Sequence, residues 1–260
     1  MSWFRTKNKP DSQAPAIQIS EKYGVRYLHL GSDTVQSAMR IADPIELVLP
    51  YTHCMMGFAL FAWRPKIITV IGLGGASLPK FIYKHMPKSI VESVELHPEV
   101  VAVAHHSFDF PDDPIRLPVT IGDGGAFVAA KEDHADVLMV DGFGSHKLAD
   151  NLCSDAFYHA AKRALTENGI MVVNLWRSSP QFHMLVSRIS AIFEQRILLL
   201  PDYKHGNTIV LAFAKAQDDP RWRSLEARAS QLESEMGLPF KMLVERLRDE
   251  NTHSEDNLLI

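Results

Sequence analysis

The sequence predicts an α/β fold in which a mostly parallel sheet carries helices on both faces. Strand patterns alternate with helical patterns from residue 67 to residue 193, as in a doubly wound sheet. A glycine-rich turn follows the first of these strands, and an acidic residue follows each of the next three. Two further strand patterns flank the turn DYKHGN, which predicts a C-terminal hairpin that adds one antiparallel strand.

The N-terminal region predicts a small antiparallel segment ahead of this sheet. Residues 1–16 are polar and predict a flexible tail. The strand patterns of a meander cover residues 17–20, 25–30 and 35–40. Residues 45–49 predict one more strand, which Pro50 would end. We therefore assign residues 17–51 to an N-terminal β segment.

The rest of the chain predicts one nucleoside-binding domain, at residues 52–216, and a charged helical tail, at residues 217–260. An apolar helical pattern at 55–63 opens the domain. The predicted strands that follow cover residues 67–71, 89–95, 119–121, 135–140, 170–175, 196–201 and 208–214. The predicted helices cover residues 78–85, 98–107, 125–131, 154–165 and 181–193. Leucines of the tail can pack it against the domain.

Composition limits the classes of function. The chain has 260 residues and a formal net charge of −4, so no nucleic-acid partner is expected. No apolar run reaches transmembrane length and the polar start does not resemble a signal peptide, so no membrane partner is expected. The only cysteines, Cys54 and Cys153, are typical of a reducing compartment, and we predict a cytoplasmic location. The sequence contains neither HExxH nor CxxC, and no metal site is expected.

The first parallel strand ends in the turn Gly72-Leu73-Gly74-Gly75. Glycines at this place permit unusual dihedral angles and a close approach of a ligand to the backbone. Ser77 stands where a complete dinucleotide motif has its third glycine, so the match is incomplete. A plain tight turn is the alternative interpretation.

Acidic residues end the next three strands, where ligands of a parallel sheet bind. Glu95 lies about 20 residues after the glycines, where a carboxylate accepts hydrogen bonds from ribose hydroxyls. Asp123, between Gly122 and Gly124, can hold the amino group of adenine or cap the next helix. Asp141 follows an apolar strand, either at the mouth of the crevice or in a simple turn.

Together these strand ends predict a Rossmann-like sheet of the class I methyltransferase type that binds an S-adenosylmethionine-type nucleoside. A nicotinamide dehydrogenase would explain the glycines and Glu95, but neither Asp123 nor the final hairpin.

The residues also resemble the spermidine synthase (polyamine aminopropyltransferase) family. The similar segments read LHLGSDTVQ at 28–36, VELHPEV at 94–100, IGDG at 121–124, VD at 140–141 and SDAFY at 154–158. The resemblance covers about residues 17–215. It implies a site for decarboxylated S-adenosylmethionine or methylthioadenosine, and transfer of an aminopropyl group to a small-molecule amine in polyamine biosynthesis. Family dimers form partly through the N-terminal strands, which implies a possible homodimer.

The resemblance assigns roles to individual residues. Those implied to bind the nucleoside co-substrate are Gln36, Gly72, Gly74, Gly75, Glu95, Asp123 and Gly124. Among them Glu95 would bind the ribose and Asp123 the adenine. Asp141 is implied to be catalytic: it would orient and help deprotonate the amine for an in-line displacement at the carbon next to a sulfonium.

Two acidic residues of the family pattern are glycine here. Gly75 stands where the glycine loop usually has an Asp that holds the positive aminopropyl end. Gly144 stands where a second Asp, after Asp141, usually binds the acceptor. Nucleoside recognition is therefore better supported than polyamine recognition. The alternatives to an aminopropyl transferase are a methyltransferase that uses S-adenosylmethionine and a non-catalytic nucleoside-binding member that lost the polyamine site.

Overall fold

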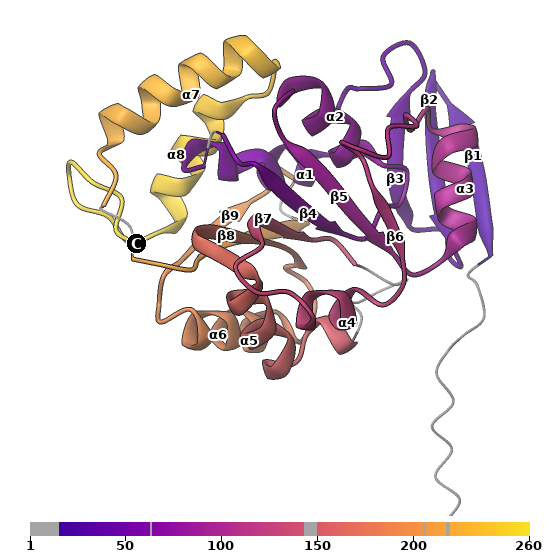
Figure 1. Cartoon of the computed structure of the whole chain (residues 1–260). Helices are drawn as coiled ribbons and strands as arrows, with labels where there is room; N and C mark the ends of the chain where they lie inside the picture. The colour runs from indigo at the N-terminus through magenta and orange to yellow at the C-terminus, as the bar shows by residue number, and fades with distance from the viewer. Residues whose placement is uncertain (1–15, 63, 143–149, 205, 217–218) are drawn as a thin grey trace, which may run out of the picture.

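The computed structural model describes residues 16–62, 64–142, 150–204, 206–216 and 219–260, which form two sheets and the helices around them (Figure 1). The strands are β1 (Ile17–Lys22), β2 (Val25–Leu30), β3 (Val35–Arg40), β4 (Ile67–Ile71), β5 (Ile90–Glu95), β6 (Val119–Ile121), β7 (Ala135–Val140), β8 (Leu165–Trp176), β9 (Ile197–Pro201) and β10 (Asn207–Phe213). The helices are α1 (Pro50–Met55), η1 (Met56–Leu60), α2 (Ser77–His85), α3 (Pro98–Ser107), α4 (Gly124–Ala129), η2 (Asp150–Leu152), α5 (Asp155–Ala164), α6 (Phe182–Ile192), α7 (Trp222–Met236) and α8 (Phe240–Glu250), where η marks a 3₁₀ helix.

The topology confirms the predicted fold class. The large sheet has the order β6-β5-β4-β7-β8-β10-β9, and β10 runs antiparallel to both of its neighbours. The pairings among β4, β5, β6, β7 and β8 are parallel. Strands β1, β2 and β3 form a separate antiparallel sheet, as the meander pattern predicts. The fold is thus Rossmann-like and of the methyltransferase type, with a small N-terminal sheet.

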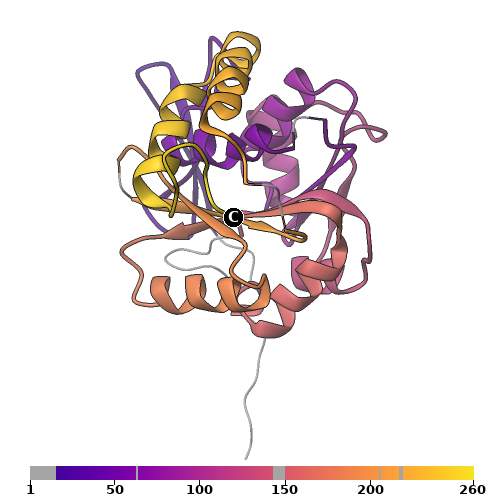
Figure 2. The ribbon, with the colours of Figure 1, turned by 90° about the vertical axis from the view of Figure 1, so that its left-hand side faces the viewer.

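Two apolar cores hold helices against the two faces of the large sheet. Val137 and Met139 of β7 belong to the core under α1, α2, α7 and α8. Leu138 and Val140 belong to the core under α4, α5 and α6. The alternation follows from the pleat of a strand, and it explains why the central strands are apolar on both faces. Figure 2 shows α7 and α8, in yellow, on one side of the sheet and α5 and α6 on the other.

The C-terminal helices pack on the body through their leucines, as the sequence predicts. Leu225 and Leu232 of α7 and Leu243 and Leu247 of α8 are buried in the first core. Burial of such side chains stabilises the fold by about 1.5–3 kcal/mol each. In the described part of the chain, no helix has the length and apolar character needed to cross a bilayer.

The segment before α1 departs from the prediction. Residues 45–49, predicted as a strand, form a turn, bends and irregular backbone, so that prediction was wrong. Asp43 explains the difference, since its carboxylate accepts a hydrogen bond from Ile45 N and its carbonyl accepts one from Glu46 N. Local acceptors thus take up the amides that a strand would offer to a neighbour. Pro50 begins a helix rather than ending a strand, as its fixed φ favours, and the helix predicted over 55–63 is a 3₁₀ turn from Met56 to Leu60.

Lys80 in α2 is a completely buried cation. Its Nζ donates a hydrogen bond to the carbonyl of Phe108 and lies 3.3 Å from Met39 Sδ. Burial lowers the pKa of Lys80 to about 8, against an opposing effect of Asp109. The buried ammonium therefore links α2 to β3 and to the end of α3.

We expect Lys80 to make stability depend on pH in the alkaline range. The folded-state pKa is below the ordinary value of 10.5, so the unfolded chain binds more protons between the two values. The free energy of unfolding should therefore rise with pH there, by at most roughly 1.4 kcal/mol per pH unit. Urea denaturation across this range should show the rise in the wild type and a flatter curve in Lys80→Met. Lys84→Met, which removes an exposed lysine of the same helix, is the control; equal slopes in all three proteins would contradict the prediction.

Candidate active site

The carboxyl ends of the parallel strands meet at one edge of the large sheet. Ile71 at the end of β4 pairs with Val94 of β5 and with Val140 of β7. Glu95 at the end of β5 pairs with Ile121 of β6. The turns after these strands therefore lie side by side, which is where open α/β sheets bind ligands.

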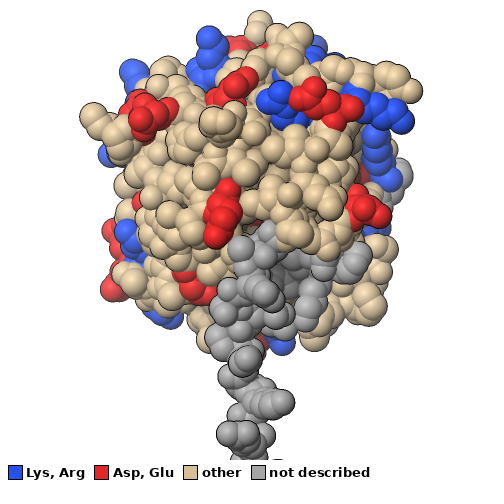
Figure 3. All heavy atoms as spheres, turned by 90° about the vertical axis from the view of Figure 1, so that its right-hand side faces the viewer, with Lys and Arg blue, Asp and Glu red and all other residues tan. Residues whose placement is uncertain are grey.

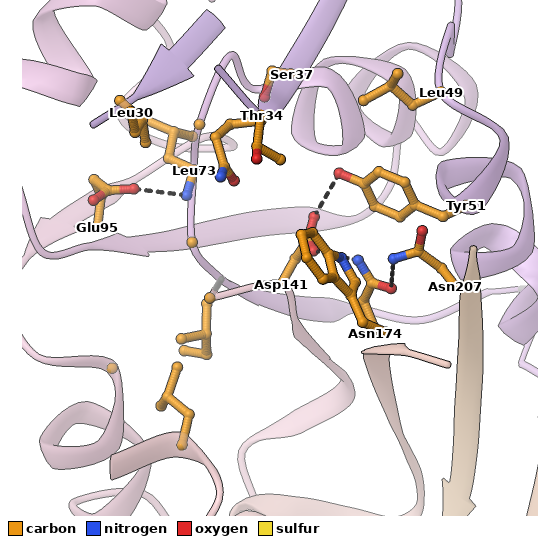
Figure 4. Close-up of a pocket in the computed structure, with 18 of the residues that line it drawn as sticks. Leu30, Thr34, Ser37, Leu49, Tyr51, Leu73, Glu95, Asp141, Asn174 and Asn207 are labelled. Atoms are coloured by element: carbon orange, nitrogen blue, oxygen red, sulfur yellow. Dashed lines mark hydrogen bonds between the residues drawn. The ribbon is translucent and has the colours of Figure 1, made fainter. Parts of the chain in front are cut away.

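A cavity of about 800 Å³ lies at this edge, between the strand ends and the N-terminal sheet. It is lined from the strand-end turns by Ile71, Gly72, Leu73, Gly74, Val94, Glu95, Leu96, His97, Gly122, Asp123, Gly124, Asp141 and Gly142. It is lined from the other elements by Leu30, Gly31, Thr34, Val35, Gln36, Ser37, Leu49, Pro50, Tyr51, Asn151, Leu152, Asn174, Trp176, Ser178, Asp202, Lys204, Gly206 and Asn207. Every residue predicted for the site except Gly75 thus borders one cavity, part of which is drawn in Figure 4.

The glycine turn forms one wall of the cavity with its backbone. Gly72 has φ = +94°, and a Cβ atom there would lie 2.6 Å from the carbonyl oxygen of Asp141. Both the dihedral angle and the close approach to the neighbouring strand end require glycine. The turn therefore brings backbone against the cavity without a side chain in between.

Glu95 joins the glycine turn to the end of β5. Its buried carboxylate accepts a hydrogen bond from Leu73 N through Oε2, at 3.0 Å (Figure 4). It accepts a second from His97 N through Oε1, at 3.1 Å. Each carboxylate oxygen has a further lone pair. Glu95 can therefore fix the turn and still accept hydrogen bonds from hydroxyl groups of a ligand in the cavity.

Asp123 serves the helix that follows it and also borders the cavity. Its Oδ1 accepts a hydrogen bond from Ala126 N at 2.7 Å, which caps α4. Its Oδ2 accepts a hydrogen bond from Asn151. Asp123 can therefore cap α4 and border the cavity in the same conformation.

Asp141 is held by donors from two other elements. Its Oδ2 accepts a hydrogen bond from the Tyr51 hydroxyl at 3.1 Å, and its Oδ1 accepts one from Asn174 Nδ2 at 2.9 Å. Burial raises the pKa of Asp141, and these two hydrogen bonds oppose the rise. Burial and the neighbouring Asp141 raise the pKa of Tyr51 well above its ordinary value, so its hydroxyl remains a donor.

Comparison with known proteins gives the family. A family model of the spermine/spermidine synthase domain matches residues 48–219. A polyamine aminopropyltransferase of Chromobacterium violaceum is 37% identical over 258 residues, which are 99% of each chain. The chain belongs to the spermine/spermidine synthase family.

Solved structures of synthases share the fold of this family member. A probable spermidine synthase from Corynebacterium glutamicum superposes with a TM-score of 0.69 at 17% identity, over 92% of this chain and 94% of that one. A spermidine synthase in complex with the transition-state analogue AdoDATO superposes with a TM-score of 0.64 at 21% identity, over 78% of this chain and 71% of that one. At these identities the likeness concerns the fold.

Gly75, where the synthase pattern has an acid, lies outside the cavity lining. Its N–H donates to Ser37 Oγ at 2.9 Å. A Cβ atom at this position would lie 2.9 Å from both Phe108 Cδ1 and Ser37 Cβ. The space that an acidic side chain would need is therefore filled by Ser37 and Phe108. The other replaced acid, at Gly144, falls outside the described residues.

We expect Gly75→Asp to destabilise the protein instead of restoring a contact to the aminopropyl group. The new side chain overpacks a filled site, which costs about 1–3 kcal/mol. Thermal denaturation should show a lower Tm for Gly75→Asp and a smaller decrease for Gly75→Ala. A Gly75→Asp protein with unchanged Tm and tighter binding of decarboxylated S-adenosylmethionine would contradict the prediction.

Several polar or aromatic residues line the cavity although they were not predicted to belong to the site, among them Tyr51, Asn174, Trp176 and Asn207. Asn174 carried a signal, because an amide side chain within the buried run 169–175 of strand β8 is unusual. Asn207 carried none, since it is one of several polar residues in a turn. Among the described residues, no group of three His, Cys, Asp or Glu side chains is arranged to hold a metal ion.

Proposed function

We propose that this family member transfers the aminopropyl group of decarboxylated S-adenosylmethionine to a small amine. One observation carries the proposal: Glu95, Asp123 and Asp141 border a single cavity beside the glycine turn. The similarity of nearly the whole chain to a polyamine aminopropyltransferase supports the same activity.

The nucleoside would occupy the half of the cavity between the glycine turn and β6. In this proposal Glu95 accepts hydrogen bonds from the ribose hydroxyls, and Asp123 accepts one from the adenine amino group. Gln36, from the N-terminal sheet, contacts the nucleoside or its tail across the cavity. Gly72, Gly74 and Gly124 would present their backbone to the ligand. A Cβ atom at any of them would lie within 2.6 Å of a neighbouring residue, so only glycine fits there.

The chemical step would be an in-line displacement. The nitrogen lone pair of the acceptor forms a bond to the aminopropyl carbon next to the sulfonium, and the carbon–sulfur bond breaks. Its electron pair stays on sulfur, which leaves neutral methylthioadenosine. The amine must give up a proton to attack, and the Asp141 carboxylate would accept it. Holding amine and carbon at near-attack distance would supply much of the remaining acceleration.

Product analysis tests the proposal directly. The protein is incubated with decarboxylated S-adenosylmethionine and putrescine, spermidine or cadaverine, and the products are identified by mass spectrometry. We expect methylthioadenosine and an aminopropylated amine in equal amounts. Calorimetry with methylthioadenosine measures nucleoside binding separately. Binding without transfer to any amine, or methyl transfer from S-adenosylmethionine, would contradict the proposed activity.

We also propose that the N-terminal sheet forms a homodimer contact. Strand β1 pairs only with β2 among the described residues, so its outer edge can accept another strand. Ile19 and Tyr23 beside this edge are exposed, at 42% and 89%. The face of the molecule that carries β1 and α3 has few charged side chains in its middle (Figure 3). Analytical ultracentrifugation should give a dimer for the wild type and a monomer for Ile19→Lys; a monomeric wild type would refute the contact.

A cytoplasmic location fits the cysteines. Cys54 and Cys153 are both buried, and neither is part of a disulfide. Cysteines outside disulfides are typical of a reducing compartment, which supports the proposed location.

A further inference from the structure

The amide side chains of Asn174 and Asn207 form a hydrogen-bonded chain that ends on Asp141 (Figure 4). Asn207 Nδ2 donates to Asn174 Oδ1 at 2.8 Å, and Asn174 Nδ2 donates to Asp141 Oδ1 at 2.9 Å. The two asparagines come from adjacent antiparallel strands, β10 and β8. The chain therefore connects the hairpin turn to the carboxylate at the sheet edge.

The direction of this chain depends on which way the Asn174 amide points. Only its NH₂ group can donate to an ionised carboxylate; turned over, the amide would place its oxygen against the oxygen of Asp141. Asn174 is buried, at 2% exposed, so a lost partner is poorly replaced by solvent. The donor from Asn207 occupies Asn174 Oδ1 and so holds the amide in the orientation that favours a charged Asp141.

The backbone of Asn207 is held by the turn before β10. Its N–H donates to Asp202 Oδ2 at 3.3 Å, and Asp202 Oδ1 accepts from Lys204 N and Gly206 N, each at 3.0 Å. Arg246 of α8 donates to the carbonyl of Asp202 at 3.1 Å. The C-terminal helix therefore buttresses the turn that presents Asn207.

We propose that Asn207 is a positioning residue that fixes the Asn174 amide and thereby keeps Asp141 charged and ready to accept a proton from the amine. The proposal rests on the proposed function, which gives Asp141 its role. The other side chain that holds Asp141 is Tyr51, from α1. The remaining titratable groups that border the cavity are Glu95, His97, Asp123, Asp202 and Lys204, and none of these described side chains is hydrogen-bonded to Asp141.

Two substitutions at Asn207 test whether the orientation of the Asn174 amide, and not only its presence, controls Asp141. Asn207→Leu removes the donor and leaves Asn174 free to turn. Asn207→Asp replaces the donor with an acceptor, which attracts the Asn174 NH₂ group and directs Asn174 Oδ1 at Asp141. The matched control is Thr208→Val, at the next position of β10. Thr208 is completely buried and its hydroxyl has no partner among the described residues, so this isosteric change perturbs the strand alone.

The decisive measurement is the pKa of Asp141, followed by carboxyl ¹³C NMR and assigned with the Asp141→Asn spectrum. In Asn207→Leu the Asn174 amide can turn, and Asp141 then loses a hydrogen-bond donor. This loss should raise the pKa of Asp141 by about one pH unit. The added negative charge in Asn207→Asp should raise it further. Thr208→Val should titrate like the wild type. In turnover assays the acidic limb of the pH profile should move to higher pH in the same order, and kcat near neutrality should fall about tenfold in Asn207→Asp.

Methylthioadenosine affinity should stay unchanged in all three variants, which shows that the cavity is intact. An Asp141 pKa that is the same in wild type, Asn207→Leu and Asn207→Asp would overturn the proposal; if Asn207→Asp fails to fold, Asn207→Leu alone decides. The NMR titration does not require turnover. A wild type without aminopropyl transfer would thus refute the proposed function, while the titration would still decide whether Asn207 controls Asp141.

Discussion

Replacement of Asp141 with Asn is expected to lower the rate of aminopropyl transfer by about 10²–10⁴-fold, the usual contribution of a positioned proton acceptor. The amide keeps the size of the side chain but cannot take the proton that the amine must lose. Because the nucleoside is proposed to bind at the other end of the cavity, methylthioadenosine affinity should change by less than about threefold. Rapid-quench assays and calorimetry on the same preparation measure the two quantities.

Tyr51→Phe provides a graded comparison for Asp141→Asn. It removes one donor to the carboxylate and leaves the carboxylate itself in place. The rate should fall by at most about tenfold, and the acidic limb of the pH profile should move to higher pH because a donor that favours the charged form is lost. An Asp141→Asn protein that retains more activity than Tyr51→Phe would rule out a proton-accepting role for Asp141.

Replacement of Glu95 with Gln is expected to weaken methylthioadenosine binding by roughly 10–100-fold, the value of about one charge-assisted hydrogen bond. Two effects act in the same direction. The ribose hydroxyls lose a charged acceptor, and the new NH₂ group must face either Leu73 N or His97 N, both of which are donors. The glycine turn would then lose part of its support.

Glu92→Gln is the control for Glu95→Gln. Glu92 lies on the same strand, but its carboxylate is hydrogen-bonded to Thr69 and His134 and does not border the cavity. Its substitution should leave nucleoside affinity unchanged even if it lowers Tm. Calorimetry that finds wild-type affinity for Glu95→Gln would exclude the proposed ribose contact.

Local sequence patterns were enough to predict the large sheet, its helices and most of the groups at the strand ends. Apolar β-branched runs specify buried strands locally, and in a parallel sheet the residue after each strand must reach the same edge. This is why the positions of Glu95, Asp123 and Asp141 in the sequence were enough to predict that the three residues lie at one site. The antiparallel hairpin was equally local, because a polar turn between two apolar runs predicts it.

The surroundings of those groups depend on contacts between segments that are far apart in the sequence. Tyr51 and Asp141 are 90 residues apart in the chain, and Asn207 reaches Asn174 across 33. Such contacts leave no periodic trace in the sequence, because they arise from how separately formed elements pack. The same holds for Gly75. Only the packing of Ser37 and Phe108 around it shows that an acidic side chain has no room at this position. Local pattern thus placed the acids at the sheet edge, and packing between distant segments fixed their orientation and hydrogen-bond partners.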